Sequence, residues 1–420
     1  MKKKNKRNKG NKKWDKVIKI AIIALVVILV GELIYFGYKV YSNRKNSTFY
    51  TVTNSMVLTK EGYVGAGFSD YKKSKFNEFE NGYNKATIFV NKNKKTVKEI
   101  GYKKGFNSYF NDLIQTKDGY VAVGSIEVTK KQNKNSLSEG LIIKYDKNFK
   151  IVWKKNISAL DKTDLLKVKL DKNNNIIIVG SSTYGEGYIG NHKNGGAILL
   201  KLNQKGKELL RVNWGGPYSG QFNDVLVEDD GYVAVGFSSK NNGLIIKYNT
   251  AGKKLWTGTY GYTDKNGITG IDKIGNKYYV STTKMIDKTK IENYQAAVVA
   301  FNKTGEKIDE VKYSSNKITT FSDIQVTNDK KIIVCGTTGK IEDNKTITDA
   351  VIVKYDKDLY EEKSTLFKEK KNDLYKQIVL NKDRIIVLGY TNSKINNGNG
   401  YEYFPFVVEY TKNLKQKNIY

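Results

Sequence analysis

A short apolar run that ends beside a small residue recurs seven times along this chain, and this repetition limits the possible folds more than any other feature. Three of the copies read GYVAVGS (119–125), NIIIVGS (175–181) and GYVAVGF (231–237). A second apolar run follows each copy, as in LIIKYD, LIIKYN and AVIVKYD, and weaker runs stand before and after the pair. Short runs separated by turn-forming residues, without a helical period, predict a repeated unit of four β-strands. The small residues of the successive copies are Gly67, Gly124, Gly180, Gly236, Ser281, Gly336 and Gly389.

The composition of the middle runs predicts how the repeated units pack. YVAVGF and LIIKY are apolar at almost every position, rather than alternately apolar and polar. Strands of this kind must be covered on both faces. Stacking the sheets in a ring covers both faces of each sheet, and glycine in the second strand suits positions where neighbouring backbones come close. The sequence therefore predicts an all-β fold, a seven-bladed β-propeller of four-stranded antiparallel blades, over residues 54–420.

Two segments carry a resemblance to a known family. GGPYSGQFNDVLVEDDGYVAVG (215–236) and GLIIKYNTAGKKLW (243–256) resemble the repeat of the bacterial seven-bladed β-propeller family. The likeness extends over about residues 54–420 and is weakest in blade 5, where Ser281 replaces glycine. It implies a propeller of bacterial origin with the strand DVLV innermost, as in WD-repeat blades, although their Trp-Asp pair is absent. The resemblance implies no single activity, because propellers host both binding and catalysis.

The N-terminal segment has the pattern of an uncleaved signal anchor. Residues 1–16 carry nine Lys or Arg side chains, and an apolar run over 17–40 is interrupted only by Lys19, Glu32 and Lys39. A helix of about 20 residues is long enough to cross the hydrocarbon core of a membrane. The basic residues before the run predict a cytoplasmic N-terminus, a single transmembrane helix, a linker over 41–53 and an extracytoplasmic propeller. The residues expected to mark the membrane span are Val17, Ile20, Val30, Glu32 and Tyr38.

A cleaved signal peptide is the alternative to an anchor. No A-x-A site follows the apolar run, and no cysteine stands near its end as a lipoprotein signal requires, so the anchor is the better interpretation. Glu32 either reaches the outer interface of the membrane or makes a polar contact with another membrane helix. The second possibility would make the protein a structural subunit of a membrane complex.

The charge of the chain indicates the kind of surface it meets. Lys and Arg exceed Asp and Glu by 31 (73 minus 42); 11 of this excess lies in residues 1–45 (13 basic minus 2 acidic), which leaves 20 for residues 46–420. A basic surface attracts anionic polymers and membranes. Because the propeller is expected outside the cell, wall polymers and lipid head groups are expected partners, and nucleic acid is not. The single cysteine, Cys335, excludes an intramolecular disulfide and is expected to be a small buried apolar residue.

The longer connections between strands indicate which end of the ring binds a partner. The connections from second to third strands, such as 182–196 and 391–405, and from fourth to first strands, such as 213–224, share one end of an antiparallel ring. Binding residues concentrate on long loops held by a rigid scaffold, and aromatic rings stack on sugars or anchor proteins. The alternative is that these rings pack the loops against the rim. The candidate binding residues are Tyr184, Tyr188, His192, Trp214, Tyr218, Tyr401, Tyr403 and Phe404.

Motifs for catalysis, metals and cofactors are weak in this sequence. His192 is the only histidine, which excludes a His-His metal site. GEGYIG (185–190) lacks the helix that a dinucleotide fingerprint requires, and DKNNN (171–175) lacks the full calcium-loop pattern. No cofactor and no metal are therefore expected. A recurring aspartate at the entrance of the first strands is expected to bond loop backbone rather than to react; it stands at Asp112, Asp224 and Asp323.

These observations favour a binding or scaffold propeller at the cell envelope, anchored in the cell membrane. It would engage a protein or an anionic or glycan polymer through its long-loop face. The alternative is an enzyme, a glycan hydrolase or lyase that uses carboxylates in the central funnel. No spacing in the sequence identifies such a carboxylate pair, so an enzyme is the less favoured interpretation.

Overall fold

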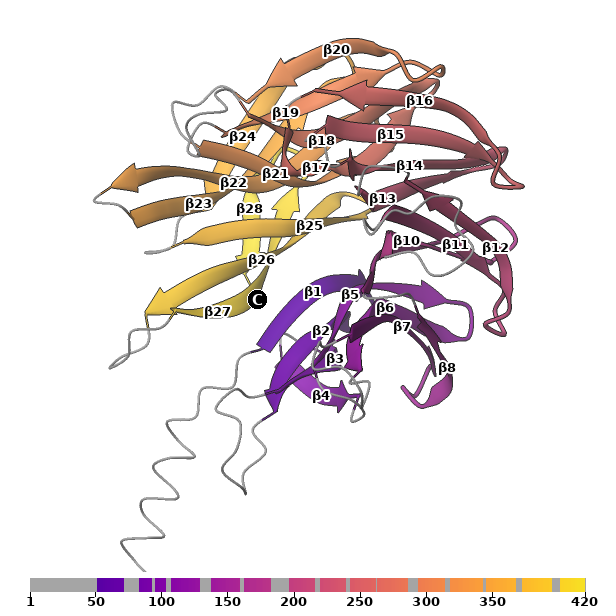
Figure 1. Ribbon diagram of the computed structural model, residues 1–420. Coiled ribbons are helices and arrows are strands. Elements are labelled where there is room, and N and C mark those ends of the chain that lie inside the picture. Colours follow the sequence, from indigo (N-terminus) through magenta and orange to yellow (C-terminus); the bar gives the residue numbers. More distant parts are fainter. Residues whose placement is uncertain are drawn as a thin grey trace, which may run out of the picture. The chain divides into compact units, whose positions relative to one another are not determined.

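The computed structural model describes residues 51–71, 83–92, 95–102, 107–128, 137–158, 162–182, 196–215, 220–238, 242–261, 263–285, 294–313, 318–342, 345–367, 372–394 and 401–419. The predicted cytoplasmic tail and the anchor, with Val17, Ile20, Val30, Glu32 and Tyr38, lie outside these ranges. Residues Tyr50–Tyr420 form one compact unit. Within the described ranges, the regular structure consists of seven four-stranded antiparallel sheets (Figure 1), which confirms the predicted all-β, seven-bladed propeller. No helix in these ranges has the length and apolar character needed to cross a bilayer.

Each blade uses four strands that are consecutive in the sequence. Blade 1 consists of β1 (Thr51–Leu58), β2 (Gly62–Tyr71), β3 (Tyr83–Lys92) and β4 (Lys95–Gly101). Blade 2 consists of β5 (Ser108–Thr116), β6 (Gly119–Val128), β7 (Leu137–Asp146) and β8 (Ile151–Ile157). Blade 3 consists of β9 (Thr163–Leu170), β10 (Ile176–Ser182), β11 (Gly196–Leu202) and β12 (Glu208–Trp214). Blade 4 consists of β13 (Gly220–Glu228), β14 (Gly231–Ser238), β15 (Asn242–Asn249) and β16 (Lys254–Tyr260).

The remaining three blades follow the same order. Blade 5 consists of β17 (Thr263–Ile274), β18 (Lys277–Met285), β19 (Tyr294–Phe301) and β20 (Lys307–Lys312). Blade 6 consists of β21 (Ile318–Val326), β22 (Ile332–Glu342), β23 (Lys345–Tyr355) and β24 (Glu361–Phe367). Blade 7 consists of β25 (Asp373–Asn381), β26 (Arg384–Lys394), β27 (Tyr401–Thr411) and β28 (Gln416–Ile419). Part of the connection expected over 391–405 is therefore strand, because β26 and β27 stay paired out to Lys394 and Tyr401.

The apolar middle strands pack between neighbouring blades, as predicted. Ile332 and Val334 of β22 lie in a buried cluster shared with blade 5, whereas Ile333 and Cys335 lie in a cluster shared with blade 7. Successive side chains of a strand point to opposite faces of the sheet. Both faces of β22 are therefore covered, which explains why its sequence does not alternate. Cys335 is free and buried, in agreement with the prediction.

The glycine of the second strand is required by a close approach to the first strand. A Cβ atom on Gly124 would lie 1.9 Å from the carbonyl oxygen of Tyr109, and one on Gly336 would lie 2.0 Å from that of Thr320. The prediction that Ser281 occupies the equivalent position in blade 5 is wrong. Register places Thr282, not Ser281, opposite Ile268, just as Gly336 lies opposite Phe321 in blade 6.

Blade 5 accommodates the larger Thr282 side chain by a change in its first strand. Gly267 in β17 has φ +68°, in the left-handed region that favours glycine. The Thr282 hydroxyl donates a hydrogen bond to the Gly267 carbonyl oxygen at 2.9 Å. The carbonyl that excludes a side chain in the other blades thus becomes an acceptor in blade 5.

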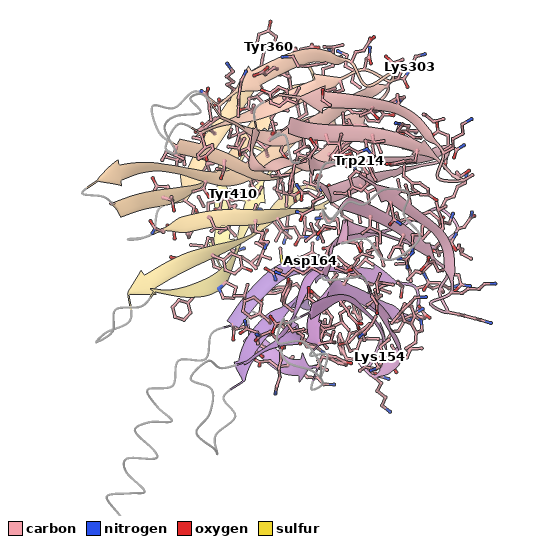
Figure 2. All side chains as sticks on the ribbon, viewed as in Figure 1. Lys154, Asp164, Trp214, Lys303, Tyr360 and Tyr410 are labelled. Atoms are coloured by element: carbon pink, nitrogen blue, oxygen red, sulfur yellow. The ribbon has the colours of Figure 1, made fainter. Side chains whose placement is uncertain are left out.

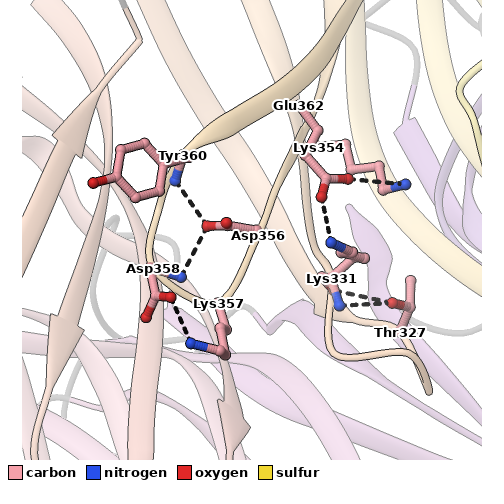
Figure 3. A network of polar contacts seen from close by, with 8 residues as sticks. All are labelled: Thr327, Lys331, Lys354, Asp356, Lys357, Asp358, Tyr360 and Glu362. Atoms are coloured by element: carbon pink, nitrogen blue, oxygen red, sulfur yellow. Dashed lines mark hydrogen bonds and ion pairs between the residues drawn. The ribbon is translucent and has the colours of Figure 1, made fainter.

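In blades 2 to 6, the hairpins between third and fourth strands share one hydrogen-bonding pattern. In blade 6, the Asp356 carboxylate accepts hydrogen bonds from the backbone N–H groups of Asp358 and Tyr360, both at 2.9 Å (Figure 3). Asn249 in blade 4 accepts the equivalent bonds from Ala251 and Lys253. The recurring Asp or Asn after the third strand therefore stabilises a turn, as Asx residues commonly do.

Candidate binding channel and loop face

The structure describes only part of the predicted loop-face site. Tyr184, Tyr188, His192 and Tyr218 lie outside the described residues, and Tyr401 and Tyr403 lie in β27 with side chains that are likewise not described. Phe404, on the same strand, is 43% exposed. The binding role of this face therefore stays a prediction.

Trp214 lies at the end of β12 and is partly buried (Figure 2). Its ring packs against Phe222 of blade 4, with the ring centroids 6.4 Å apart and the planes tilted by 41°. A Cβ atom on Gly220 would lie 2.5 Å from the indole. Trp214 thus joins blades 3 and 4, which is the packing alternative weighed for the aromatic residues of this face.

A central channel is lined by the first strand of each blade. The half nearer the long connections holds a cavity of about 420 Å³, here called the loop-side cavity, and the half nearer the tight turns holds one of about 440 Å³, the turn-side cavity. Every first strand carries a β-bulge, and the bulged residue of each blade lines the loop-side cavity. These seven residues are Asn54, Asn111, Leu166, Asn223, Thr269, Ser322 and Lys376.

Most of the bulged polar side chains bond to the next blade. The Asn54 amide donates to the Phe110 carbonyl oxygen at 2.7 Å, and the Asn111 amide donates to that of Leu165 at 2.9 Å. The Asn223 amide repeats this bond to Ile268 at 2.8 Å. These side chains tie one blade to the next.

The recurring aspartates form a second set of ties between blades. They lie within the first strands, immediately after the bulges, rather than at strand entrances as predicted from the sequence. Asp112 accepts a hydrogen bond from the Val168 N–H at 2.9 Å, and Asp323 accepts one from the Ile378 N–H at 2.8 Å. Asp224 is 3.3 Å from the Ile271 nitrogen in the same arrangement. Their predicted structural role is confirmed, but the backbone they bond belongs to the neighbouring blade.

Two lysines interrupt these regular positions and were missed in the sequence. Lys167 occupies the position of Asp112 in blade 3, and Lys376 occupies the bulge position of blade 7. Alignment of the first strands offers a signal for both, because a cation replaces an anion or an amide. The Lys376 amine donates to the Asn54 amide oxygen at 2.9 Å. The Lys167 amine makes no hydrogen bond or ion pair with the residues that the structure describes.

The lysines affect each other through the channel. Burial, followed by the positive charge of Lys167, lowers the pKa of Lys376 to about 8, and the charge of Asp112 opposes this shift. Burial alone would also lower the pKa of Lys167, but Asp112, Asp224 and Asp323 outweigh burial and raise it above its ordinary value. The pKa of Lys376 therefore lies close to physiological pH.

Asp164 lies at the start of β9 (Figure 2). Its carboxyl is one of three on the described first strands whose pKa burial raises, with those of Asp272 and Asp323. Burial raises the pKa of Asp164 to about 6, although hydrogen bonds from Tyr109 and Asn111 oppose the shift. The Asn111 amide is 2.7 Å from one carboxylate oxygen, and the Tyr109 hydroxyl is 3.2 Å from the other. A carboxylic acid with a pKa near 6 has the property of a general acid or base. Among the described residues, no group of three or more His, Cys, Asp or Glu side chains is placed to hold a metal ion.

No protein-family model matches the sequence, and no curated protein matches it in sequence. Solved structures with a similar arrangement include the periplasmic gluconolactonase of Pseudomonas aeruginosa (10% identity, TM-score 0.44, 85% of this chain and 96% of that one). Drosophila Plexin A in complex with Semaphorin 1b has 8% identity and a TM-score of 0.38, over 73% of this chain and 82% of that one. An α-L-arabinofuranosidase from Clostridium thermocellum has 14% identity and a TM-score of 0.34, over 64% and 96%. Likenesses this distant bear on neither activity nor partner.

Proposed function

We propose that this chain is a binding or scaffold protein of the bacterial cell envelope. A cytoplasmic tail (1–16) and a membrane span (17–40) would hold the propeller outside the cell membrane. The face that carries the long connections would engage a protein or an anionic or glycan polymer.

The hydrogen bonds that the channel carboxylates make are the observation that supports binding over catalysis. One oxygen of Asp112 accepts from the Ser55 hydroxyl at 2.5 Å, and the other accepts from the Val168 N–H. Both oxygens of Asp323 are likewise bonded, to the backbone of Ile324 and Ile378. In each carboxylate, one of these bonds goes to the backbone of the following blade, so both groups help to hold blades together. These groups therefore suit a rigid platform better than a reaction centre.

The proposed partner follows from charge and from exposed aromatic groups. The excess of 20 positive charges in residues 46–420 favours an anionic polymer or an acidic protein surface. Phe404 offers an exposed aromatic side chain at the same end of the propeller as the predicted loop tyrosines. Nucleic acid is not proposed, because it is absent from the side of the membrane where the propeller would lie.

Crosslinking in intact cells, followed by mass spectrometry, tests this function. We expect the triple variant Tyr184→Ser, Tyr188→Ser, Phe404→Ser to lose most of the crosslinked partner. Trp214 is left intact because it joins two blades. The matched control is Tyr360→Ser: Tyr360 is 73% exposed but lies in a third-to-fourth-strand hairpin at the opposite end of the blades. Equal loss in both variants, or no loss in the triple variant, would exclude the loop face.

A glycan hydrolase or lyase is the second candidate, and Asp164 is the observation that favours it. Its pKa of about 6 suits a group that exchanges protons near neutral pH. A digestion screen of envelope polysaccharides separates the candidates. Cleavage that depends on a group with a pKa near 6, and that is lost in Asp164→Asn, would establish the enzyme. The absence of any Asp164-dependent cleavage would leave the binding function in place.

A further inference from the structure

We propose that the loop-side cavity of the channel is a binding site for a small oxyanion, a carboxylate or phosphate group held between Lys167 and Lys376. This site is separate from the loop face and does not depend on the partner proposed for it.

The cavity has the size and the lining of a small-molecule site. Its volume of about 420 Å³ lies in the range of pockets that hold small ligands. Lys167 enters from β9 and Lys376 from β25, so the two amines come from blades 3 and 7. The rest of the lining is rich in amides and hydroxyls, including Ser322, Thr320 and Gln221.

The charge balance distinguishes this cavity from the other half of the channel. Two ammonium groups and one carboxylate, Asp112, line the loop-side cavity. The turn-side cavity is lined by Lys167 and Lys169 and by two aspartates, Asp112 and Asp323, and burial raises the pKa of Asp323. Both oxygens of Asp112 already accept hydrogen bonds, so its charge is partly screened from a ligand. The loop-side cavity therefore holds one carboxylate fewer than the turn-side cavity for the same number of ammonium groups, which favours an anion there.

Hydrogen-bond donors remain available in this cavity. An ammonium group has three donors, and Lys376 uses one of them on Asn54. Neither the Lys167 amine nor the Ser322 hydroxyl bonds to any residue that the structure describes. Three side chains from three blades that line this cavity therefore have donors available for an oxyanion.

Repulsion between the lysines supplies the electrostatic reason for a ligand. The charge of Lys167 is one of the causes that lower the pKa of Lys376. An oxyanion between the two amines replaces this repulsion with two charge-assisted hydrogen bonds, which are stronger than neutral ones. Binding should therefore raise the pKa of Lys376 toward its ordinary value.

Calorimetric titration of the full chain in detergent tests the site with three probes. Inorganic phosphate and glucuronate carry the two kinds of oxyanion, and glucose is the neutral match for glucuronate. We expect at least one oxyanion to bind and glucose not to bind, and the tighter oxyanion identifies the head group. Lys167→Met and Lys376→Met should each weaken this binding at least tenfold. Lys303→Met, in an exposed hairpin, removes the same charge outside the channel and should leave the affinity unchanged.

Three results would overturn the site: no oxyanion binding at millimolar concentration, glucose binding as tightly as glucuronate, or equal loss in Lys303→Met. A measurement on the unsubstituted chain guards against variants that misfold. Acetic anhydride should acetylate Lys376 at pH 8, and saturating oxyanion should slow this reaction at least fivefold without protecting Lys303. Equal acetylation of Lys376 with and without the oxyanion contradicts the proposal.

Discussion

Six of the seven junctions between blades differ from the one that closes the ring. Among the described residues, each of the six joins neighbouring blades through a cluster of 11 to 13 buried apolar side chains. The junction of blades 7 and 1 has three, Met56, Leu388 and Val407. Blades that follow one another in sequence therefore stack by apolar burial, whereas the two ends of the chain meet with much less of it.

Hydrogen bonds between blades 7 and 1 contribute to the closing junction. The Gln377 side-chain oxygen accepts from the Met56 N–H at 2.8 Å, and Tyr390 donates its hydroxyl to the Thr53 carbonyl oxygen. No strand from one end of the described chain enters the sheet of the other end. A typical hydrogen bond contributes about 1 kcal/mol net, whereas burying a large apolar side chain contributes about 1.5–3 kcal/mol. The comparison predicts that the ring opens first between blades 7 and 1.

The largest expected effect comes from an interior junction. Phe321, 1% exposed, lies in the cluster between blades 5 and 6. Phe321→Ala should lower the free energy of unfolding by about 3–5 kcal/mol, because it leaves a cavity in a closely packed cluster. Leu388→Ala, at the closing junction, should cost less, about 2 kcal/mol, because fewer side chains surround it. Urea unfolding of the full chain measures both, and a larger loss for Leu388→Ala would reverse the comparison.

A smaller effect is expected at the closing junction from Gln377, which occupies the position that aspartate holds in other blades. Gln377→Ala leaves the Met56 N–H without its acceptor, at a cost of about 1–3 kcal/mol. Amide hydrogen exchange should then accelerate along both β1 and β25. Asp272→Ala removes the acceptor of the Val326 N–H between blades 5 and 6, and there the apolar cluster should confine faster exchange to β21. Unchanged exchange in β1 of Gln377→Ala would show that this bond does not hold the ring closed.

A pH dependence is also expected at the same junction. Lys376 titrates at about 8 in the folded chain and at its ordinary 10.5 when unfolded, so between these values the unfolded chain binds more protons. The contribution of Lys376 to stability therefore rises as the pH rises from about 8 to 10.5. Its charge is a cost below pH 8. Thermal unfolding should show Lys376→Met gaining stability relative to the unsubstituted chain at pH 7 and losing that gain by pH 10; a pH-independent difference contradicts this.

The sequence predicted the blades well because burial leaves a direct mark on composition. A strand covered on both faces, such as β22, must be apolar at successive positions, and this pattern needs no knowledge of its neighbours. Ser281 was placed at the glycine position because serine, like glycine, is small, and this placement was wrong. Only strand register shows that Thr282 faces the first strand.

The channel could not be predicted in the same way. Lys167 and Lys376 are single departures from a repeat, and their proximity depends on how blades 3 and 7 face a common axis. The reach of β26 to Lys394 was missed because backbone pairing, rather than hydrophobicity, extends that hairpin. Tyr184 and Tyr188 stay predictions, since they lie in a connection outside the described residues.

The β-bulge of each first strand presents one residue to the channel, and its chemistry differs from blade to blade. The same inward position holds an amide at Asn111, an isobutyl group at Leu166 and an ammonium at Lys376, while the sheets behind them keep one design. A mutation at such a position alters what a diffusing solute meets without rewriting any strand pairing. At Asn111, however, the same side chain also bonds to the backbone of the next blade, so a substitution there changes the channel surface and the stability of the ring together.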